Sequence, residues 1–277
     1  MPSFTSTNNN PADSAILASS AGEGLHAEST STAVAAVAAF QLDQAPASTG
    51  PAVFGEARGG GTALVGLQVN AQSGGSGVYG ECKGSGSGVH GEAKGNGNGV
   101  FAKVNNPNGS GAALYAEHSG DKTAGFFKGN VVVTGDVSFP GMDCAEEFVV
   151  SSDPAIGPGT LMSIGDDGVL EPSASAYDNR VVGVVAGAGD FRPGIVMGKG
   201  QHGERPARPI ALVGRAYCKA DARYGAIRVG DLLTSSPHPG HAMKASDQGR
   251  AFGAVIGKAM APLDEGAGLV PILIALQ

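Results

Sequence analysis

Large aromatic side chains are scarce in this chain of 277 residues, which has no tryptophan and an aromatic fraction of 5%. Each large aromatic side chain buries about 150–250 Å² in a conventional core, so we do not expect a single compact core. Glycine, by contrast, contributes 46 residues, more than twice its usual share of about 7%. Small apolar residues with abundant glycine favour thin structures in which backbones approach closely.

Positive charge is also scarce, with 18 lysines and arginines against 25 aspartates and glutamates and a net charge of −7. Nucleic-acid binding needs a basic surface that displaces phosphate counterions, so we expect no nucleic-acid partner. The three cysteines, Cys82, Cys144 and Cys218, are far apart and form no C-x-x-C motif. This spacing predicts buried free thiols rather than a disulfide framework or a zinc site.

Long apolar runs are absent as well. No stretch approaches the roughly 18–20 apolar residues of a membrane-spanning helix, so we expect no membrane span. Residues 1–10 lack the charged-then-apolar pattern of a secretory signal. The sequence therefore predicts synthesis in the cytoplasm without a signal peptide, and any action outside the cell would require release by lysis or by a dedicated machine.

The common catalytic patterns are missing too. The glycine-rich segments 187–189 and 198–200 do not match a phosphate-binding loop, and Ser235 lies outside a G-x-S-x-G turn. His238 and His241 resemble a metal-binding pair, but no third ligand accompanies them, and a solvated loop is the simpler interpretation. We expect no cofactor, no metal site and no enzymatic activity, with autoproteolysis left open.

A short unit recurs through the first half of the chain: two apolar or aromatic residues, then glycine or alanine, then usually a polar residue, as in Val78-Tyr79-Gly80-Glu81. From Gly55 onward the third position recurs at intervals of 11, 14, 11, 11, 14 and 11 residues. Runs rich in glycine, asparagine and serine separate the units, and a strand of about 4–6 residues followed by a turn of similar length fits this period. The small residues of the units are Ala27, Gly55, Gly66, Gly80, Gly91, Ala102 and Ala116.

In a strand, successive side chains alternate between two faces. The first apolar residue and the small residue of a unit therefore share one face, and the aromatic and polar residues share the other. A face limited to small residues indicates that something packs very close to it. Short strands in one chain would leave long unpaired edges, whereas three chains wound together would pair every edge and bury the small face along a common axis. We therefore predict a triple-stranded β-helix in an interwoven homotrimer, with a single-chain β-solenoid and a disordered linker as alternatives.

The composition changes near residue 128, and many short candidate strands follow, separated by glycine and proline. Residues 130–139 predict a β-hairpin, and the remainder predicts an all-β domain of the sandwich or barrel class. We expect a flexible or attachment segment at 1–22, a β-repeat stalk at 23–129, a hairpin connector at 130–141 and a C-terminal β domain at 142–277. The strands expected in that domain span 147–150, 161–164, 181–186, 195–197, 210–217, 232–234, 251–259 and 269–276.

The C-terminal region contains a series of ordered motifs: Met142–Phe148, Tyr177–Val185, Ile210–Arg215, Gly230–Ser236, Ala242–Ala245, Val255–Ala259 and Leu263–Gly266. In this order the motifs resemble the C-terminal domains of phage tail fibres and related bacterial fibre-like proteins. They are more distantly similar to the autoproteolytic chaperone domains of phage tail spikes, the peptidase G2 type. The glycine-rich repeats resemble the triple β-helical stalks of the same proteins.

The resemblance implies trimerisation, folding assistance for the stalk and presentation of a receptor-binding tip. We expect a structural and adhesive fibre of a phage tail or a phage-derived contractile injection system, acting in a virion, in an injection particle or outside the cell after release. Its implied partners are itself, a baseplate or tail protein at the N-terminus, and a cell-surface glycan or protein at the C-terminal domain. The alternatives are a self-cleaving chaperone tip and a polysaccharide-binding spike. For self-cleavage, Asp143 and Glu146 could supply acid–base chemistry, although an exposed acidic turn is the simpler interpretation.

Overall fold

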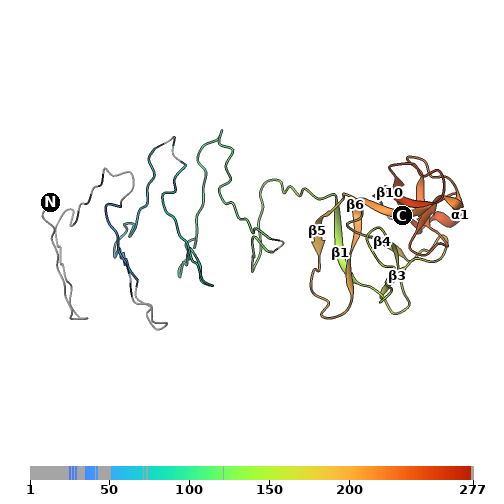
Figure 1. Cartoon of the computed structure of the whole chain (residues 1–277), viewed down its shortest axis with the longest axis horizontal. Helices are drawn as coiled ribbons and strands as arrows, with labels where there is room; N and C mark the ends of the chain where they lie inside the picture. The colour runs from blue at the N-terminus through green and yellow to red at the C-terminus, as the bar shows by residue number, and fades with distance from the viewer. Residues whose placement is uncertain are drawn as a thin grey trace. The chain divides into compact units, whose positions relative to one another are not determined.

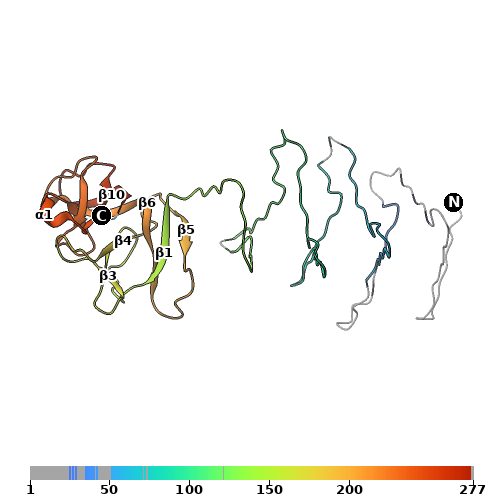
Figure 2. The same ribbon diagram turned by 180° about the vertical axis from the view of Figure 1, so that it is seen from behind.

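The computed structural model describes residues 25, 27, 29, 35–40, 42, 51–70, 72, 74–120 and 122–275. The chain divides into two units, Met1–Ala124 and Gly125–Gln277, and each is described by itself. Figures 1 and 2 show that all the strands belong to the C-terminal unit. The secondary structure is almost entirely β, as the sequence predicts. The attachment segment expected at 1–22 lies outside the described residues.

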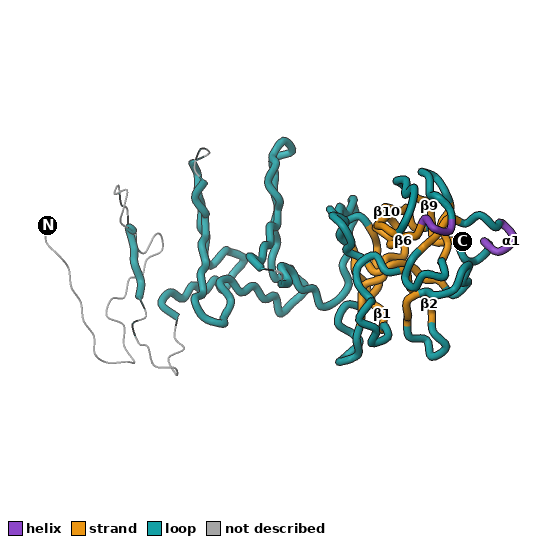
Figure 3. Tube along the Cα trace, turned by 45° about the vertical axis from the view of Figure 1, so that its right-hand side comes forward, coloured by secondary structure: helices purple, strands orange, loops and turns teal. Residues whose placement is uncertain are grey.

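The N-terminal unit consists of extended segments joined by turns, and Figure 3 draws its described residues as loop. Between the described residues of this unit, two backbone hydrogen bonds form. Gly109 N donates to Asn106 O over 3.0 Å and Lys122 N donates to Gly120 O over 2.7 Å, so both close local turns. The described residues of the repeats therefore form no β-ladder within one chain, and the triple-stranded stalk stays a proposal.

The described residues of the C-terminal unit, 125–275, form ten strands, one 3₁₀ turn and one short helix. They are β1 (Asp143–Val149), β2 (Leu161–Ile164), β3 (Leu170–Pro172), β4 (Val181–Val185), β5 (Pro193–Met197), β6 (Ala207–Asp221), η1 (Ala222–Tyr224), β7 (Leu232–Ser235), β8 (Ala242–Lys244), α1 (Gln248–Ala251), β9 (Val255–Ala259) and β10 (Ala267–Ile274).

Five of the strands close a ring. β10 pairs with β9, β9 with β7, β7 with β8, β8 with β6, and β6 again with β10. β6 also extends into an open sheet, where it pairs with β1 and β4, while β5 adds to β1 and the hairpin β2–β3 adds to β4. The predicted barrel-like all-β domain is confirmed in this form.

The long strand β6 changes neighbours at Gly214. This residue pairs with Asp143 of β1 and with Ile274 of β10. Its φ is +106°, and a Cβ at this position would lie 2.6 Å from the carbonyl oxygen of Met142. An L side chain would be strained by the backbone angle and by the contact. Glycine therefore allows one strand to serve both the ring and the open sheet.

The core of this unit is aliphatic. The larger cluster packs Leu161, Ile227 and Ile272 among valines and alanines, and a smaller one packs Met162 against Ile210. Among the described residues, no phenylalanine or tyrosine is buried. Each large aliphatic side chain contributes about 1.5–3 kcal/mol on full burial, so the domain obtains a core without the aromatic residues that the chain lacks.

Several strand predictions need correction. Residues 130–141, expected as a hairpin, contain no strand in the single chain. The strand expected at 251–259 begins at Val255, because Asp247 caps the short helix α1 that precedes it. The short strands β3 and β8 were not predicted. β1 and β6 extend beyond the ranges expected for them.

Candidate functional site

The small residues of the repeat pack against the next repeat of the same chain. A Cβ at Gly91 would lie 2.5 Å from the carbonyl oxygen of Gly99 and 2.8 Å from Cγ2 of Val100. At Gly66 and Gly80, a Cβ would overlap the matching carbonyl group and valine of the following unit. Glycine at these positions is therefore required by close contact between backbones.

A second small residue in each unit escaped the sequence analysis. It directly precedes the first apolar residue of the unit, and its backbone lies against the small residue of the preceding unit. A Cβ at Gly99, for example, would lie 3.0 Å from the carbonyl oxygen of Gly91. A five-residue version of the repeat would have identified this position. From residue 51 onward its members are Ala52, Ala63, Gly77, Gly88, Gly99, Ala113 and Ala124.

The aromatic and acidic residues of a unit share one face, as the alternation of side chains predicts. The hydroxyl of Tyr79 donates to Glu81 Oε2 over 3.3 Å, and that of Tyr115 donates to Glu117 Oε2 over 2.8 Å. Each pair is two residues apart, which places both members on the same side of an extended segment.

Both faces of the repeat are exposed in the single chain. Tyr79 is 78% exposed, Phe101 is 76% exposed and Val89 is 71% exposed, and the other units follow the same pattern. Monomeric proteins rarely expose apolar side chains in a continuous row, and such rows mark interaction surfaces. The repeats at 51–120 therefore form a candidate assembly surface. Among the predicted small positions, the described residues Gly55, Gly66, Gly80, Gly91, Ala102 and Ala116 lie along it, and Ala27 is an isolated described residue.

Asp143 forms a second candidate site, at the start of β1. It is buried rather than part of an exposed turn, and neither carboxylate oxygen has a hydrogen-bond partner among the described residues. Burial raises the pKa of Asp143 to about 6. The residue lines a cavity of about 350 Å³ together with Phe139, Cys144 and Val213. Glu146 lies three residues further along the same strand and is half-buried.

The histidine pair is part of an ordered cluster rather than a solvated loop. His238 Nδ1 lies 2.7 Å from Oδ2 of the buried Asp221, and the rings of His238 and His241 stack with centroids 3.7 Å apart. Desolvation by burial lowers the pKa of His241. Two parallel rings do not converge on one ion. In the described part of the chain, no three His, Cys, Asp or Glu side chains gather closely enough to hold a metal.

All three cysteines are free thiols, but their environments differ. Cys218 is buried as expected, and burial raises its pKa to about 12. Cys144 is only partly buried and Cys82 is exposed, which corrects the expectation of burial for these two. No helix within the described residues has the length and apolar character needed to cross a membrane.

Neither a family model nor a curated protein matches the chain. Two solved structures of bacteriophage phi29 gene product 12 are similar to it. Its C-terminal fragment is 14% identical with a TM-score of 0.35, over 48% of this chain and 100% of that one. The pre-mature gene product 12 is 14% identical with a TM-score of 0.38, over 56% of this chain and 24% of that one. Similarity at these scores supports no inference about activity or partners.

Proposed function

We propose that this chain is the subunit of a homotrimeric fibre, with a structural and adhesive role in a phage tail or a phage-derived contractile injection system. The repeats form its stalk, and the C-terminal domain sets the register of the three chains and presents a receptor-binding tip. The observation that carries the proposal is the repeat region at 51–120, where the described residues leave their apolar side chains exposed and form no β-ladder within one chain.

Assembly would remove two energetic costs of the single chain: the exposure of its apolar side chains to water, and the lack of strand partners for its extended backbone. Full burial of a valine or phenylalanine contributes about 1.5–3 kcal/mol, and the stalk repeats this gain in every unit. Extended backbone that loses contact with water must find hydrogen-bond partners. Within one chain, the small residues already bring successive units into contact, as Gly91 does with Gly99. In the proposed trimer, the two other chains supply the missing strand neighbours.

Three is the smallest number of chains that gives each strand two different neighbours around an axis. Two chains would leave one edge of each strand open, and open edges invite aggregation. A three-fold ring closes without leaving an edge, and closed point-group symmetry is the usual state of homo-oligomers.

The C-terminal domain has a core of its own and can fix the register of the stalk. Because the repeat units resemble one another, three chains can also pair one unit out of step. A folded domain that trimerises at one end removes this ambiguity. The segment 1–22 then remains for attachment to a baseplate or another tail protein.

Limited proteolysis of the full-length protein tests the proposal. The described part of the stalk at 23–129 offers trypsin six sites, at Arg58, Lys83, Lys94, Lys103, Lys122 and Lys128. An assembled stalk resists cleavage at these sites under native conditions and becomes sensitive after dissociation by heat. Rapid native cleavage at all six sites would refute the fibre.

The environment of Asp143 favours a second candidate function, self-cleavage at the boundary of the C-terminal domain. A carboxyl group with a pKa raised to about 6 can donate and accept a proton near neutral pH, and it lies beside the connector at 130–141. Intact-mass measurement tests this directly. Cleavage near Pro140 or Asp143 gives two fragments, and neither fragment forms in Asp143→Asn. A single species of 27.3 kDa under all conditions excludes it.

A further inference from the structure

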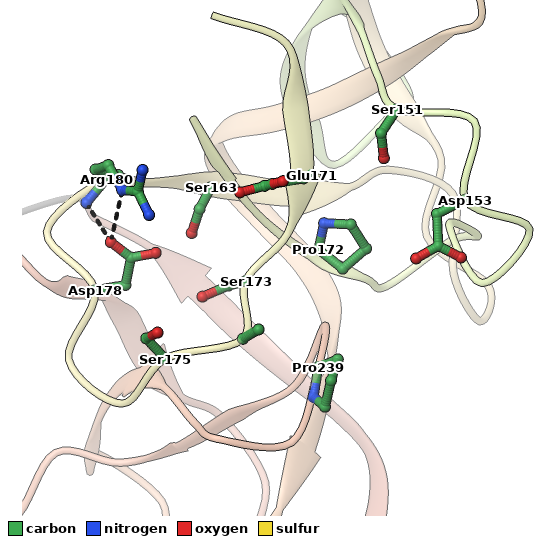
Figure 4. A pocket seen from close by; sticks show the side chains of 11 residues that line it. Ser151, Asp153, Ser163, Glu171, Pro172, Ser173, Ser175, Asp178, Arg180 and Pro239 are labelled. Carbon is green, nitrogen blue, oxygen red and sulfur yellow. Dashed lines mark hydrogen bonds and ion pairs between the residues drawn. The ribbon is translucent and has the colours of Figure 1, made fainter. Parts of the chain in front are cut away.

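A polar pocket of about 380 Å³ opens beside the β2–β3 hairpin of the C-terminal domain (Figure 4). Its volume lies in the range of about 300–1,000 Å³ that ligand pockets occupy. Segments far apart in the chain contribute to it: the loop after β1, the strands β2 and β3, the loop from 173 to 180, and Pro239 from the loop after β7. Its polar groups include Asp153, Ser163, Glu171, Ser173, Ser175 and Asp178.

Two hydroxyl groups of the pocket lack a partner. Ser163 and Ser173 are each 1% exposed, and neither hydroxyl has a hydrogen-bond partner among the described residues. Figure 4 shows both hydroxyls pointing to the side on which the Asp178 carboxylate lies. An unsatisfied buried hydroxyl costs about 1–3 kcal/mol, and two at one site indicate that something else completes their hydrogen bonds.

The wall formed by residues 173–180 is fixed in place. Asp178 N donates to Ser235 Oγ over 2.8 Å, and Tyr177 N donates to the carbonyl oxygen of Ser235 over 3.2 Å. Tyr177 has a φ of +60°, which L residues rarely adopt, and the guanidinium of Arg250 lies 4.5 Å above its ring. The pocket is therefore formed before any ligand enters, which lowers the entropic cost of binding.

Pro239 also lines the pocket, and both of its neighbours in the chain are held in place. Gly240 N donates to the carbonyl oxygen of Ser173 over 2.7 Å, and Leu161 N donates to that of Gly240 over 2.9 Å. On the other side of Pro239, His238 is held on the buried carboxylate of Asp221. These bonds position Pro239 at the rim of the pocket.

The charges of the pocket select against anions. It has three carboxylates, at Asp153, Glu171 and Asp178, and one guanidinium, at Arg180. That guanidinium is already engaged, through Nη1 with Asp166 at 2.9 Å and through Nε with Asp178 at 3.5 Å. Carboxylates accept and serine hydroxyls both donate and accept, so together they match a ligand rich in hydroxyl groups.

We propose that this pocket binds one unit of a non-anionic saccharide and is the part of the tip that recognises a cell-surface glycan, an inference that rests on the receptor-binding role proposed above. Asp178 and Glu171 accept hydrogen bonds from sugar hydroxyls, and Ser163 and Ser173 complete theirs with the ligand. One sugar in one such site binds weakly, and three pockets in a trimer raise the avidity for a repeated glycan.

Binding to the full-length protein is measured by calorimetry and ligand-observed NMR, with the methyl glycosides of glucose, galactose, mannose and N-acetylglucosamine as probes. The methyl glycoside of sialic acid serves as the anionic comparison. At least one neutral glycoside binds in the millimolar range, and the anionic one does not. Ser173→Ala and Glu171→Gln each weaken binding about tenfold, the loss of one good hydrogen bond. Ser152→Ala, an exposed serine outside the pocket, leaves binding unchanged.

Absence of binding by all four neutral glycosides overturns the proposal, as does equal binding by wild type and Ser173→Ala. If water alone completes the hydrogen bonds of the buried hydroxyls, Ser173→Ala changes the free energy of unfolding while no glycoside binds. That result also refutes the proposal. Light scattering on the same samples gives their molar mass, which distinguishes a failure of the pocket proposal from a failure of the fibre proposal. A trimer without sugar binding refutes only the pocket, and sugar binding by a monomer refutes only the fibre.

Discussion

The Nδ1 atom of His238 lies 2.7 Å from Oδ2 of Asp221, a carboxylate whose side chain is completely buried. The same carboxylate is paired with the Arg223 guanidinium: the single Nε hydrogen is shared between Oδ1 at 2.9 Å and Oδ2 at 3.0 Å, and Nη2 also donates to Oδ2. The Arg223 side-chain bonds are the largest cause that holds the pKa of Asp221 far below its usual range, and His238 adds to them. This contact secures the loop that positions Pro239.

Replacing Asp221 with asparagine should therefore destabilise the C-terminal domain by about 1–3 kcal/mol, the cost of lost charge-assisted bonds at a buried group. Urea unfolding measures this loss. Asp166→Asn is the matched control, because its carboxylate is fully exposed although it also pairs with an arginine. A change of about 0.5 kcal/mol or less is expected there.

The stability difference between wild type and Asp221→Asn should depend on pH with a definite sign. A carboxyl whose folded pKa is depressed stabilises the fold fully above its unfolded pKa of about 3.9 and loses this contribution as the pH falls through the folded value. The difference between wild type and Asp221→Asn should stay constant from pH 8 to pH 5 and shrink in strong acid. A difference that grows below pH 4 would contradict the assignment.

Asp143 should behave in the opposite way. Its folded pKa is raised to about 6 by burial, above an unfolded value of about 3.9. Between these values the folded state binds more protons than the unfolded state, so stability falls as the pH rises through this window. At pH 8, Asp143→Asn should be more stable than wild type by about 1–2 kcal/mol. This is less than the full pKa shift implies, because solvent reaches the cavity. Near pH 4 the two proteins should be equally stable. Glu146→Gln, the same kind of carboxyl-to-amide change on the same strand, is the control.

The repeat glycines give a prediction with an internal control. A Cβ at Gly91 meets the carbonyl group of Gly99, whereas a Cβ at Gly95 meets nothing within 4 Å. Gly91→Ala should destabilise the assembled stalk by about 1–3 kcal/mol per chain, the usual cost of overpacking. Gly95→Ala, four residues away, should leave it unchanged. Thermal dissociation followed on SDS gels compares the two, and equal midpoints would show that the small position is not under packing constraint.

The strands that sequence reasoning found are those with strong local signals. Leu161–Ile164 is a short, mostly apolar segment followed by Gly165, and the structure places β2 there without change. Local sequence patterns mispredict segments whose secondary structure is decided by tertiary contacts. Ala251–Ala259 is rich in apolar residues, yet the Asp247 side chain accepts hydrogen bonds from Gly249 N and Arg250 N, and the helical turn that it starts includes Ala251. The three-residue strand β8 exists only through its pairing with β7 and β6.

The sites were harder to predict than the elements. The small positions of the repeat were visible because the period displays them, and their partners one unit later were missed only because the unit was read as four residues. The burial of Asp143 had no local signal, since it depends on β5 and β6 packing on both sides of β1. The saccharide pocket brings together Asp153, Ser173 and Pro239, and no spacing in the sequence relates these residues.

Thiol reactivity tests the C-terminal core. Burial raises the pKa of Cys218 to about 12, so at pH 8 almost none of it is thiolate, the form that reacts. In the native protein a disulfide reagent should leave Cys218 unmodified, whereas denatured protein should react at all three cysteines. Peptide mapping identifies the modified residue. Native modification of Cys218 as fast as that of the exposed Cys82 would show that this part of the ring opens readily.

The central claim is that three chains complete the stalk, and native mass spectrometry of the full-length protein tests it most directly. The account predicts a main species of three times 27.3 kDa at micromolar concentration, which falls to the single-chain mass only after the stalk is dissociated. A compact monomer of 27.3 kDa under native conditions would contradict it, and would leave the single-chain solenoid as the explanation of the repeats.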